Sequence, residues 1–487
     1  MSTLGPYAIE QDYSHYVSKS SGIIFGVVGT ATKGPVNEPT LCTSSTDFIR
    51  KFGNPDPNHI GLYAAMYYLN QGNRCYYVRA EGATPAAKAA LSIPGKKDET
   101  VVSSAITLTA NTPGTYYNNL KVIVAASIVG YKITVAEGSR TLEVIMYQIG
   151  DTFNSAYFTA TAVTEDLTEL TPGTYTAAGG TDSDTGLVAA NWIKALETLK
   201  SSVYDINLFA VPGISDNAVI TQALQIAEAR GDALFLVDPP NNLDPDDVTD
   251  WHNGTSEYSS TSSLYNSSYG ALYYSWQNIY DQNNGQYLDI PPSAVVAQAM
   301  AKSARETAIW LPPAGMTRGK IEGVVQPVYS PDDGERDALY SDYNAVNCII
   351  EDPTEGLVVF GQKTLLRSNT ALNRVNVRML MNYLKRVIVA AAKYLTFEPN
   401  DQYTWNSFED LVEPTLRSIG QRRGLYAYRI VKGEEIVTND DIDNYRMPCK
   451  ILIQPTKAAE EIPIYFTITR TGVDFNEVLD SDYIATI

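Results

Sequence analysis

Short apolar segments alternate with segments of helical period along much of this chain, and this alternation constrains the fold more than any other feature. Near the N-terminus, the strand-like residues 22–29 and 74–80 flank a helical segment at 59–71. The alternation resumes after residue 186, with helical segments at 187–200 and 217–230 and strand-like segments at 206–211 and 233–237. Strand–helix–strand repeats favour parallel strands with helices on both faces of the sheet. We therefore expect an α/β domain.

A change of composition interrupts this pattern. Residues 97–186 are rich in Thr, Ala, Val and Tyr, contain Pro-Gly turns at 113–114 and 172–173, and hold several short runs of alternating polarity. Such runs, separated by turn residues, are typical of an antiparallel β domain. We predict an α/β domain formed by residues 21–96 and 187–360, with a β-rich inserted domain at 97–186.

The remaining third of the chain predicts a C-terminal domain at residues 361–473. Its most regular helix covers residues 371–395, a second helix covers 405–420, and strands are expected at 426–431, 450–455 and 462–470. The overall expectation is an α/β fold class (α+β overall) with several domains.

Charge and cysteine content narrow the classes of function. The chain has 36 basic and 55 acidic residues, a net charge of −19, which disfavours binding to nucleic acid because phosphate backbones are also negative. Its four cysteines are far apart and form no C-x-x-C pair, which indicates buried thiols in a reducing compartment. We find no secretory signal and no apolar run near the ~18 residues that span a bilayer, so we expect no membrane insertion.

Residues for catalysis or metal binding are sparse. The three histidines, His15, His59 and His252, are far apart, and no nucleophile elbow or complete phosphate-binding loop is present. Acidic clusters at 244–250 and 332–337 do not match calcium-loop spacing, so we interpret them as solvated loops. We expect no enzyme, no metal site and no cofactor, although a Ser–His–Asp set assembled from distant residues stays open.

The helical segment at 371–395 carries basic residues and no acidic one, in a chain whose acids outnumber its bases. At 100° per residue these side chains fall within an arc of about 120°. The basic residues are Arg374, Arg378, Lys385, Arg386 and Lys393. One interpretation is a docking face for an acidic partner, and the other is a solvated helix face. We favour the docking face.

Both ends of the chain lack helical period and predict extended arms, at residues 1–20 and 474–487. An extended segment can add a strand to the sheet edge of a neighbouring molecule, whereas the alternative is a pair of frayed termini. The candidate arm residues are Tyr7, Tyr13, Tyr16, Asp474, Phe475, Glu477 and Tyr483.

Long stretches at both ends of the chain resemble the phage tail sheath family in order and spacing. Near the N-terminus these are GIIFGVVGTATKGPVNEPTLCTSSTDFIRKFG at 22–53 and GNRCYYVRA at 72–80. Near the C-terminus they are VNVRMLMNYLKRVIVAAAKYLTFEPND at 375–401, TWNSFEDLVEPTLRSIGQRRGLYAYRIV at 404–431 and IQPTKAAEEIPIYFTITRTGVDFNE at 453–477. The resemblance covers about half of the chain and does not extend to residues 97–186 or 241–290.

The resemblance implies a structural subunit that stacks around an inner tail tube and whose two arms complete the sheets of neighbouring subunits. A baseplate trigger would shorten this contractile sheath and drive the tube through a host cell envelope for viral genome delivery. The implied partners are further copies of the chain, the inner tail tube protein, and baseplate and tail terminator proteins. The basic helix face becomes the candidate tube-binding surface.

The implied location is a virion tail assembled in the host cytoplasm. A bacteriocin-like or toxin-delivering contractile particle would use a sheath of the same kind, and this alternative stays open. An α/β hydrolase-type enzyme is a more distant alternative, for which no clustered catalytic residues are visible.

Overall fold

The α/β domain is built on one eight-stranded sheet with the order β19-β18-β14-β13-β12-β1-β3-β2, in a computed structural model that describes residues 22–255, 258 and 264–464. Its central strands are parallel, and β2 and β19 run antiparallel at the two edges. The strands are β1 (Phe25–Gly29), β2 (Thr40–Cys42), β3 (Cys75–Arg79), β12 (Leu208–Ala210), β13 (Leu234–Val237), β14 (Gly270–Tyr274), β18 (Val346–Asp352) and β19 (Gly356–Phe360). The expected mainly parallel sheet is confirmed.

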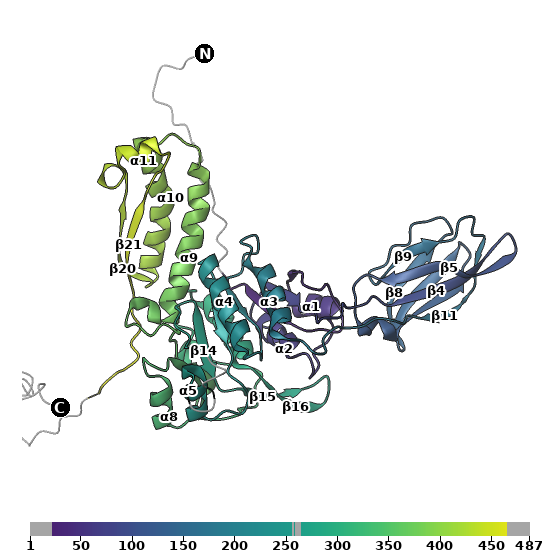
Figure 1. Ribbon diagram of the computed structural model, residues 1–487, viewed down its shortest axis with the longest axis horizontal. Helices are drawn as coiled ribbons and strands as arrows, with labels where there is room; N and C mark the ends of the chain where they lie inside the picture. The colour runs from purple at the N-terminus through teal and green to yellow at the C-terminus, as the bar shows by residue number, and fades with distance from the viewer. Residues whose placement is uncertain (1–21, 256–257, 259–263, 465–487) are drawn as a thin grey trace, which may run out of the picture.

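Helices cover both faces of this sheet, as Figure 1 shows. Alternate residues of β1 belong to different cores, with Phe25 and Val27 in one and Val28 in the other. The first core includes α1 (Ser45–Phe52), α2 (Ile60–Leu69) and α6 (Pro292–Glu306), and the second includes α3 (Ala189–Glu197), α4 (Asn217–Arg230), α5 (Pro245–Asn253) and α8 (Asp333–Leu339). The central strands β1, β12 and β13 are apolar throughout because both of their faces are buried.

The acidic clusters expected to be solvated loops form helix starts instead. Asp244 is the N-cap of α5, where its carboxylate accepts a hydrogen bond from the Asp247 backbone amide. Asp332 caps α8 in the same way through the amide of Glu335. Acidic side chains are favourable there because the first turn of a helix has unpaired N–H groups.

The inserted domain consists of two four-stranded sheets, β10-β4-β5-β9 and β11-β6-β7-β8, which share one apolar core. In Figure 1 it lies at the far end of the long axis of the molecule. Its strands are β4 (Ala90–Lys97), β5 (Thr100–Ala110), β6 (Leu120–Ala126), β7 (Tyr131–Glu137), β8 (Arg140–Tyr147), β9 (Phe158–Val163), β10 (Glu169–Leu170) and β11 (Gly173–Thr176). The expected start at residue 97 is corrected to Ala90, because β4 pairs with β5 in spite of Pro94 and Gly95.

Two charged contacts hold the base of the inserted domain to the α/β domain. The fully buried Arg79 donates to the carbonyls of Pro113 and Asp182, at 2.6 and 2.8 Å, and its guanidinium pairs with the Asp182 carboxylate at 3.3 Å. The His59 ring lies between the carboxylates of Asp56 and Asp184, at 2.6 and 3.0 Å. Burial acts to lower the pKa of His59, but the two carboxylates outweigh it and raise this pKa above its ordinary value.

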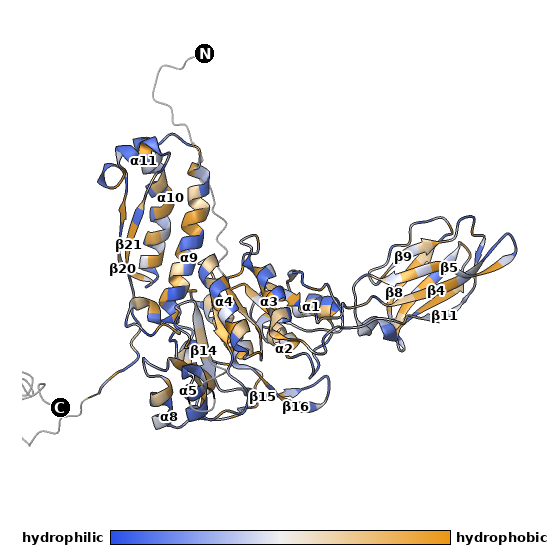
Figure 2. Ribbon diagram, in the orientation of Figure 1, coloured by the Kyte–Doolittle hydropathy of each residue, from blue (hydrophilic) through white to orange (hydrophobic). Residues whose placement is uncertain are grey.

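The C-terminal domain pairs two long helices with a two-stranded sheet. Its elements are α9 (Val375–Ala392), α10 (Gln402–Gln421), β20 (Leu425–Val431), α11 (Asn439–Asp443) and β21 (Lys450–Pro455). Figure 2 shows apolar and hydrophilic residues alternating along α9 and α10, as amphipathic helices require. Among the residues described, 462–464 form no strand, and the rest of the strand expected at 462–470 lies outside them.

Candidate functional site

Three basic residues of α9, Arg378, Lys385 and Arg386, contact the α/β domain. Arg378 is only 4% exposed, donates to the Ser268 hydroxyl at 2.5 Å, and places its guanidinium 4.0 Å from the centre of the Tyr269 ring. Burial lowers the pKa of Arg378. Lys385 donates to the hydroxyl of the same Tyr269 at 2.8 Å. Tyr269, which directly precedes β14, therefore contacts two of the five residues predicted to form the docking face.

Arg386 and Arg374 are also paired within the chain. Arg386 forms ion pairs with Asp205 and Asp232, at 2.8 and 3.5 Å, and donates to the Ile206 carbonyl at 2.9 Å. Arg374 pairs with Glu460 at 2.8 Å. The prediction of a wholly outward docking face is therefore corrected for Arg374, Arg378 and Arg386. Helical spacing identified the arc but could not identify the domain that covers it.

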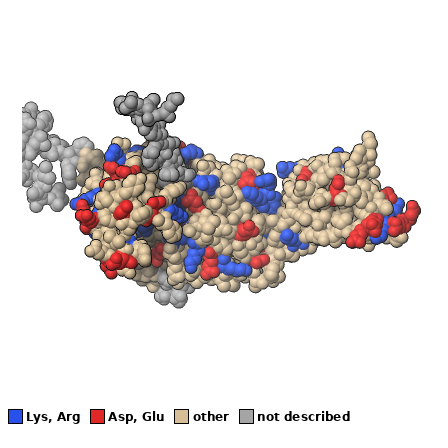
Figure 3. Space-filling view, turned by 90° about the horizontal axis from the view of Figure 1, so that it is seen from above, with Lys and Arg blue, Asp and Glu red and all other residues tan. Residues whose placement is uncertain are grey.

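A narrower stripe of α9 remains accessible. Lys385, Val389 and Lys393 follow one another at intervals of four residues and are all exposed, with Val389 at 57%. Residues four apart lie on the same face of a helix. Elsewhere, on the face of the molecule seen in Figure 3, acidic and basic side chains are interspersed. The stripe of Lys385, Val389 and Lys393 is therefore the part of the predicted surface that an outside partner can reach.

The sheet of the C-terminal domain has unpaired edges. Strands β20 and β21 pair only with each other within the described part of the chain. Their inner side chains Tyr428, Ile430, Ile451 and Ile453 pack on the core of the domain. Two-stranded sheets are marginal alone, and unpaired edge groups can accept another strand. This sheet is therefore suited to strand addition. The candidate arm residues, Tyr7, Tyr13, Tyr16, Asp474, Phe475, Glu477 and Tyr483, all lie outside the described residues.

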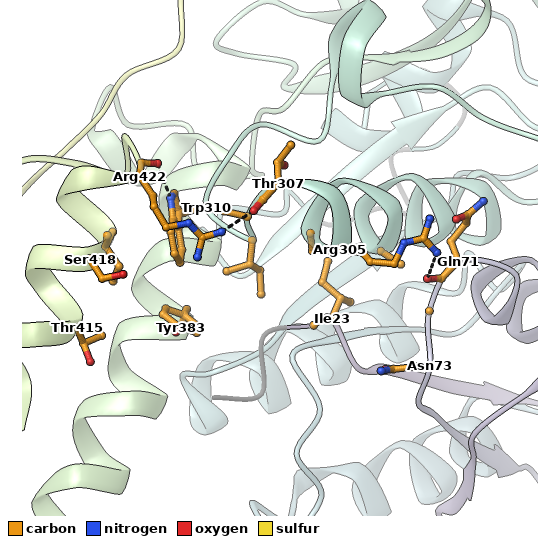
Figure 4. Close-up of a pocket in the computed structure, with 17 residues that line it drawn as sticks. Ile23, Gln71, Asn73, Arg305, Thr307, Trp310, Tyr383, Thr415, Ser418 and Arg422 are labelled. Atoms are coloured by element: carbon orange, nitrogen blue, oxygen red, sulfur yellow. Dashed lines mark hydrogen bonds between the residues drawn. The ribbon is translucent and has the colours of Figure 1, made fainter. Parts of the chain in front are cut away.

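A cavity of about 420 Å³ lies between the α/β domain and the C-terminal domain (Figure 4). Arg422 stacks on Trp310 at 4.9 Å and donates to the Thr307 carbonyl at 2.6 Å, while Arg305 donates to the Gln71 carbonyl at 3.1 Å. None of the described residues that line this cavity is His, Cys, Asp or Glu. Its polar groups join the two domains and provide no nucleophile–base pair.

Buried ionisable groups elsewhere have structural partners or apolar surroundings. Asp238 is buried after β13, where burial raises its pKa to about 6, and it accepts hydrogen bonds from Ser293 and from the Gly213 amide. His252 lies within α5 and not in a loop, and its burial lowers its pKa to about 3. Within the described ranges, no three His, Cys, Asp or Glu side chains are grouped to hold a metal ion. Of the helices that the structure describes, none is both long and apolar enough to cross a membrane.

A second cavity, of about 710 Å³, lies where the segment after β21 crosses the α/β domain. Its lining includes Arg374, Gln362, Tyr340 and Glu460. Sequence patterns did not indicate Gln362, Tyr340 or Glu460 as functional residues. The only sequence signal is a pair of glutamates in an irregular segment, which is too common to single out a site.

Two family models match this chain in consecutive order. The phage tail sheath protein central domain matches residues 185–365, and the phage tail sheath C-terminal domain matches residues 367–470. These matches include the larger part of the α/β domain and almost all of the C-terminal domain.

Curated relatives agree with these matches. The tail sheath protein of Vibrio phage KVP40 is 28% identical over 345 residues, which are 67% of this chain and 50% of the relative. The tail sheath protein of Enterobacteria phage T4 is 28% identical over 340 residues, which are 66% of this chain and 51% of the relative. The chain thus spans about half the length of the curated relatives it matches.

Solved structures share the fold. A sheath tail protein from Listeria innocua has a TM-score of 0.64 at 13% identity, covering 90% of this chain and 92% of its own. The contracted sheath complex of PVC, an extracellular contractile injection system, has a TM-score of 0.59 at 18% identity, covering 96% of this chain and 98% of its own. At these identities the likeness concerns the fold alone.

Proposed function

Because this chain belongs to the phage tail sheath family, we propose that it is the structural subunit of a contractile sheath, which polymerises around an inner tube and shortens to drive the tube through a host cell envelope. The observation that carries this proposal is the β20–β21 sheet with its unpaired edges, on a domain that matches the family model. No catalytic group is needed for this task, because the work comes from the free-energy difference between two arrangements of the same subunits.

Linking of subunits is assigned to the two predicted arms. Residues 1–20 and 474–487 would add strands to the β20–β21 sheets of neighbouring copies. The 14 residues from 474 to 487 reach about 45 Å when extended, which is enough to span to an adjacent subunit. Main-chain hydrogen bonds depend little on side-chain identity, so such links can persist while the bodies of the subunits move apart.

The tube contact is assigned to the accessible stripe of Lys385, Val389 and Lys393, facing an acidic surface of the tube protein. Exposed ion pairs contribute only ~0–1 kcal/mol each, so a row of them can guide assembly and still release during contraction. Arg374, Arg378 and Arg386 would support this contact indirectly, since they hold α9 on the α/β domain. Baseplate and tail terminator proteins would meet the two ends of the polymer.

Removal of the C-terminal arm tests the linking role. The chain lacking residues 474–487 should fold with unchanged thermal stability but remain monomeric in sedimentation, whereas the full chain should pellet as polymer. Polymerisation of the shortened chain would contradict the linking role.

A second candidate function is the sheath of a toxin-delivering particle without a genome. Two likenesses support this second candidate. One is to the PVC sheath, and the other is to the helical sheath of the anti-feeding prophage, which has a TM-score of 0.56. Electron microscopy of particles from the native host separates the two, because a virion tail carries a DNA-filled head and the alternative does not.

A further inference from the structure

The segment that follows β21 leaves its own domain and crosses to the α/β domain. The Thr456 amide still donates to the Gly424 carbonyl, at 3.1 Å, and residues 458–461 then line the cavity of about 710 Å³ beside α8. Figure 1 shows this segment (yellow) leaving the lower end of β20 and β21 and passing beside the α/β domain. Residues 458–461 therefore lie against the α/β domain and not beside the β20–β21 sheet.

One carboxylate fixes this crossing. Glu460 Oε1 accepts from Arg374 Nε at 2.8 Å and from Gln362 Nε2 at 2.9 Å. The Glu460 and Arg374 side chains are each only 26% exposed. After burial, the negative charge of Glu460 is the largest cause that raises the pKa of Tyr340, which places this tyrosine beside the same carboxylate. We call Tyr340, Gln362 and Arg374 the carboxylate pocket.

Gln362 of the carboxylate pocket is held in place by buried neighbours. Gln362 is 3% exposed, and its carbonyl accepts from the Val375 amide at 2.7 Å. The next residue, Lys363, is held by the Asn347 side chain, which accepts from its amide at 2.6 Å and donates to its carbonyl at 2.8 Å. The Gln362 donor is thus positioned by hydrogen bonds that do not involve the crossing segment.

Unused capacity in the pocket fits a carboxylate ligand. Arg374 Nη1 is a buried donor with no hydrogen-bond partner in the described structure, and both bonds to Glu460 use its Oε1. An arginine can donate two parallel hydrogen bonds to one carboxylate, so a small rotation would engage the second oxygen. The arrangement is that of a site for an acidic side chain.

We propose that Glu460 is a positioning residue, whose docking in the carboxylate pocket directs the C-terminal arm away from the subunit's own β20–β21 sheet and toward a neighbouring copy. This inference rests on the proposed function, in which residues 474–487 link subunits. Residues 462–470 have the sequence pattern of a strand, so a contact is needed that keeps them from pairing within the same chain. If released, this segment could pair with the unpaired edge of β21 in the same chain and occupy the edge that a neighbour needs.

Docking also shortens the search of the arm for its target. With Glu460 held, the arm begins at a fixed point on the α/β domain, which raises its effective concentration near the adjacent subunit. The contact acts before assembly, in the monomer, so its two consequences can be measured separately.

The test uses the full chain with Glu460→Ala and the matched control Glu461→Ala, a neighbouring glutamate without a hydrogen bond or ion pair to the described residues. In the monomer, trypsin should cleave after the exposed Lys457 about fivefold faster in Glu460→Ala, as expected for the loss of a partly exposed charged hydrogen bond, and at the wild-type rate in the control. Polymerisation followed by light scattering should lose rate in Glu460→Ala alone, in proportion to the docked fraction that the substitution removes.

Unchanged cleavage after Lys457 would overturn the docking. Faster cleavage with wild-type polymerisation would overturn the positioning role and leave the sheath proposal intact. Failure of the wild-type chain to polymerise would instead contradict the proposed function, and the cleavage measurement would still decide the docking.

Discussion

The guanidinium of Arg378 lies 4.0 Å from the centre of the Tyr269 ring, which joins the C-terminal domain to the α/β domain at one stacked pair. Lys385 donates to the hydroxyl of the same ring. The cationic arc of α9 is therefore mainly an internal joint. This changes which substitutions should affect the stability of the subunit and which should affect its partners.

Replacing Arg378 should destabilise the subunit. Arg378→Leu removes the stacked pair and leaves the Ser268 hydroxyl without its donor, which should lower the free energy of unfolding by about 1–3 kcal/mol in urea titrations. Lys393→Leu, an exposed basic residue on the same helix, is the matched control and should change stability little. Equal effects of the two substitutions would contradict the internal joint.

Charge reversal on the accessible stripe should weaken the tube contact. The pair Lys385→Glu and Lys393→Glu should reduce co-sedimentation of the chain with purified tail tube by about tenfold, since two attractive charges become repulsive. Lys121→Glu with Lys132→Glu places the same charge change on exposed residues of the inserted domain and should leave tube binding unchanged. A loss of the same size in this control would show a general effect of net charge.

Arg79 should be critical for attachment of the inserted domain. Arg79→Leu leaves the Asp182 carboxylate and the acceptor carbonyls without their buried donor, so we expect a loss of about 3–5 kcal/mol in unfolding free energy. Arg50→Leu removes an arginine whose side chain is 69% exposed and should have little effect. Near-equal stabilities of the two variants would refute the role of Arg79.

The His59 contact predicts a specific pH dependence. Because Asp56 and Asp184 raise the folded-state pKa of His59, its stabilising charge is fully present below its unfolded pKa of about 6.5 and is lost as pH rises through the higher folded value. The stability difference between wild type and His59→Gln should therefore be largest at pH 6 and shrink by pH 9, measured by urea unfolding. A difference that grows with pH would have the wrong sign for this account.

The sequence predicted helices well where the capping residues and the helical period of apolar residues agree. Helix α4 occupies the expected residues 217–230, because Asp216 caps its start and Gly231, at φ 67°, ends it. The segment expected as a helix at 371–395 contains α9, with short 3₁₀ turns at Ala371–Asn373 and Lys393–Leu395. In these cases the deciding interactions lie within one or two turns of chain.

Contacts between distant segments could not be predicted in the same way. The basic arc of α9 was visible in the sequence, but its cover depends on Tyr269, Asp205 and Asp232, which lie more than a hundred residues away. The carboxylate pocket likewise depends on Glu460 meeting Gln362, which lies 98 residues earlier in the chain. Strand β4 was missed because Pro94 and Gly95 weaken its local pattern, whereas pairing with β5 determines its structure.

The most direct test of the central claim is electron microscopy of the purified full-length chain in negative stain. The sheath account predicts hollow tubes or stacked rings of uniform width, built from this chain alone. A protein that remains monomeric over a wide range of concentration, salt and pH would contradict it.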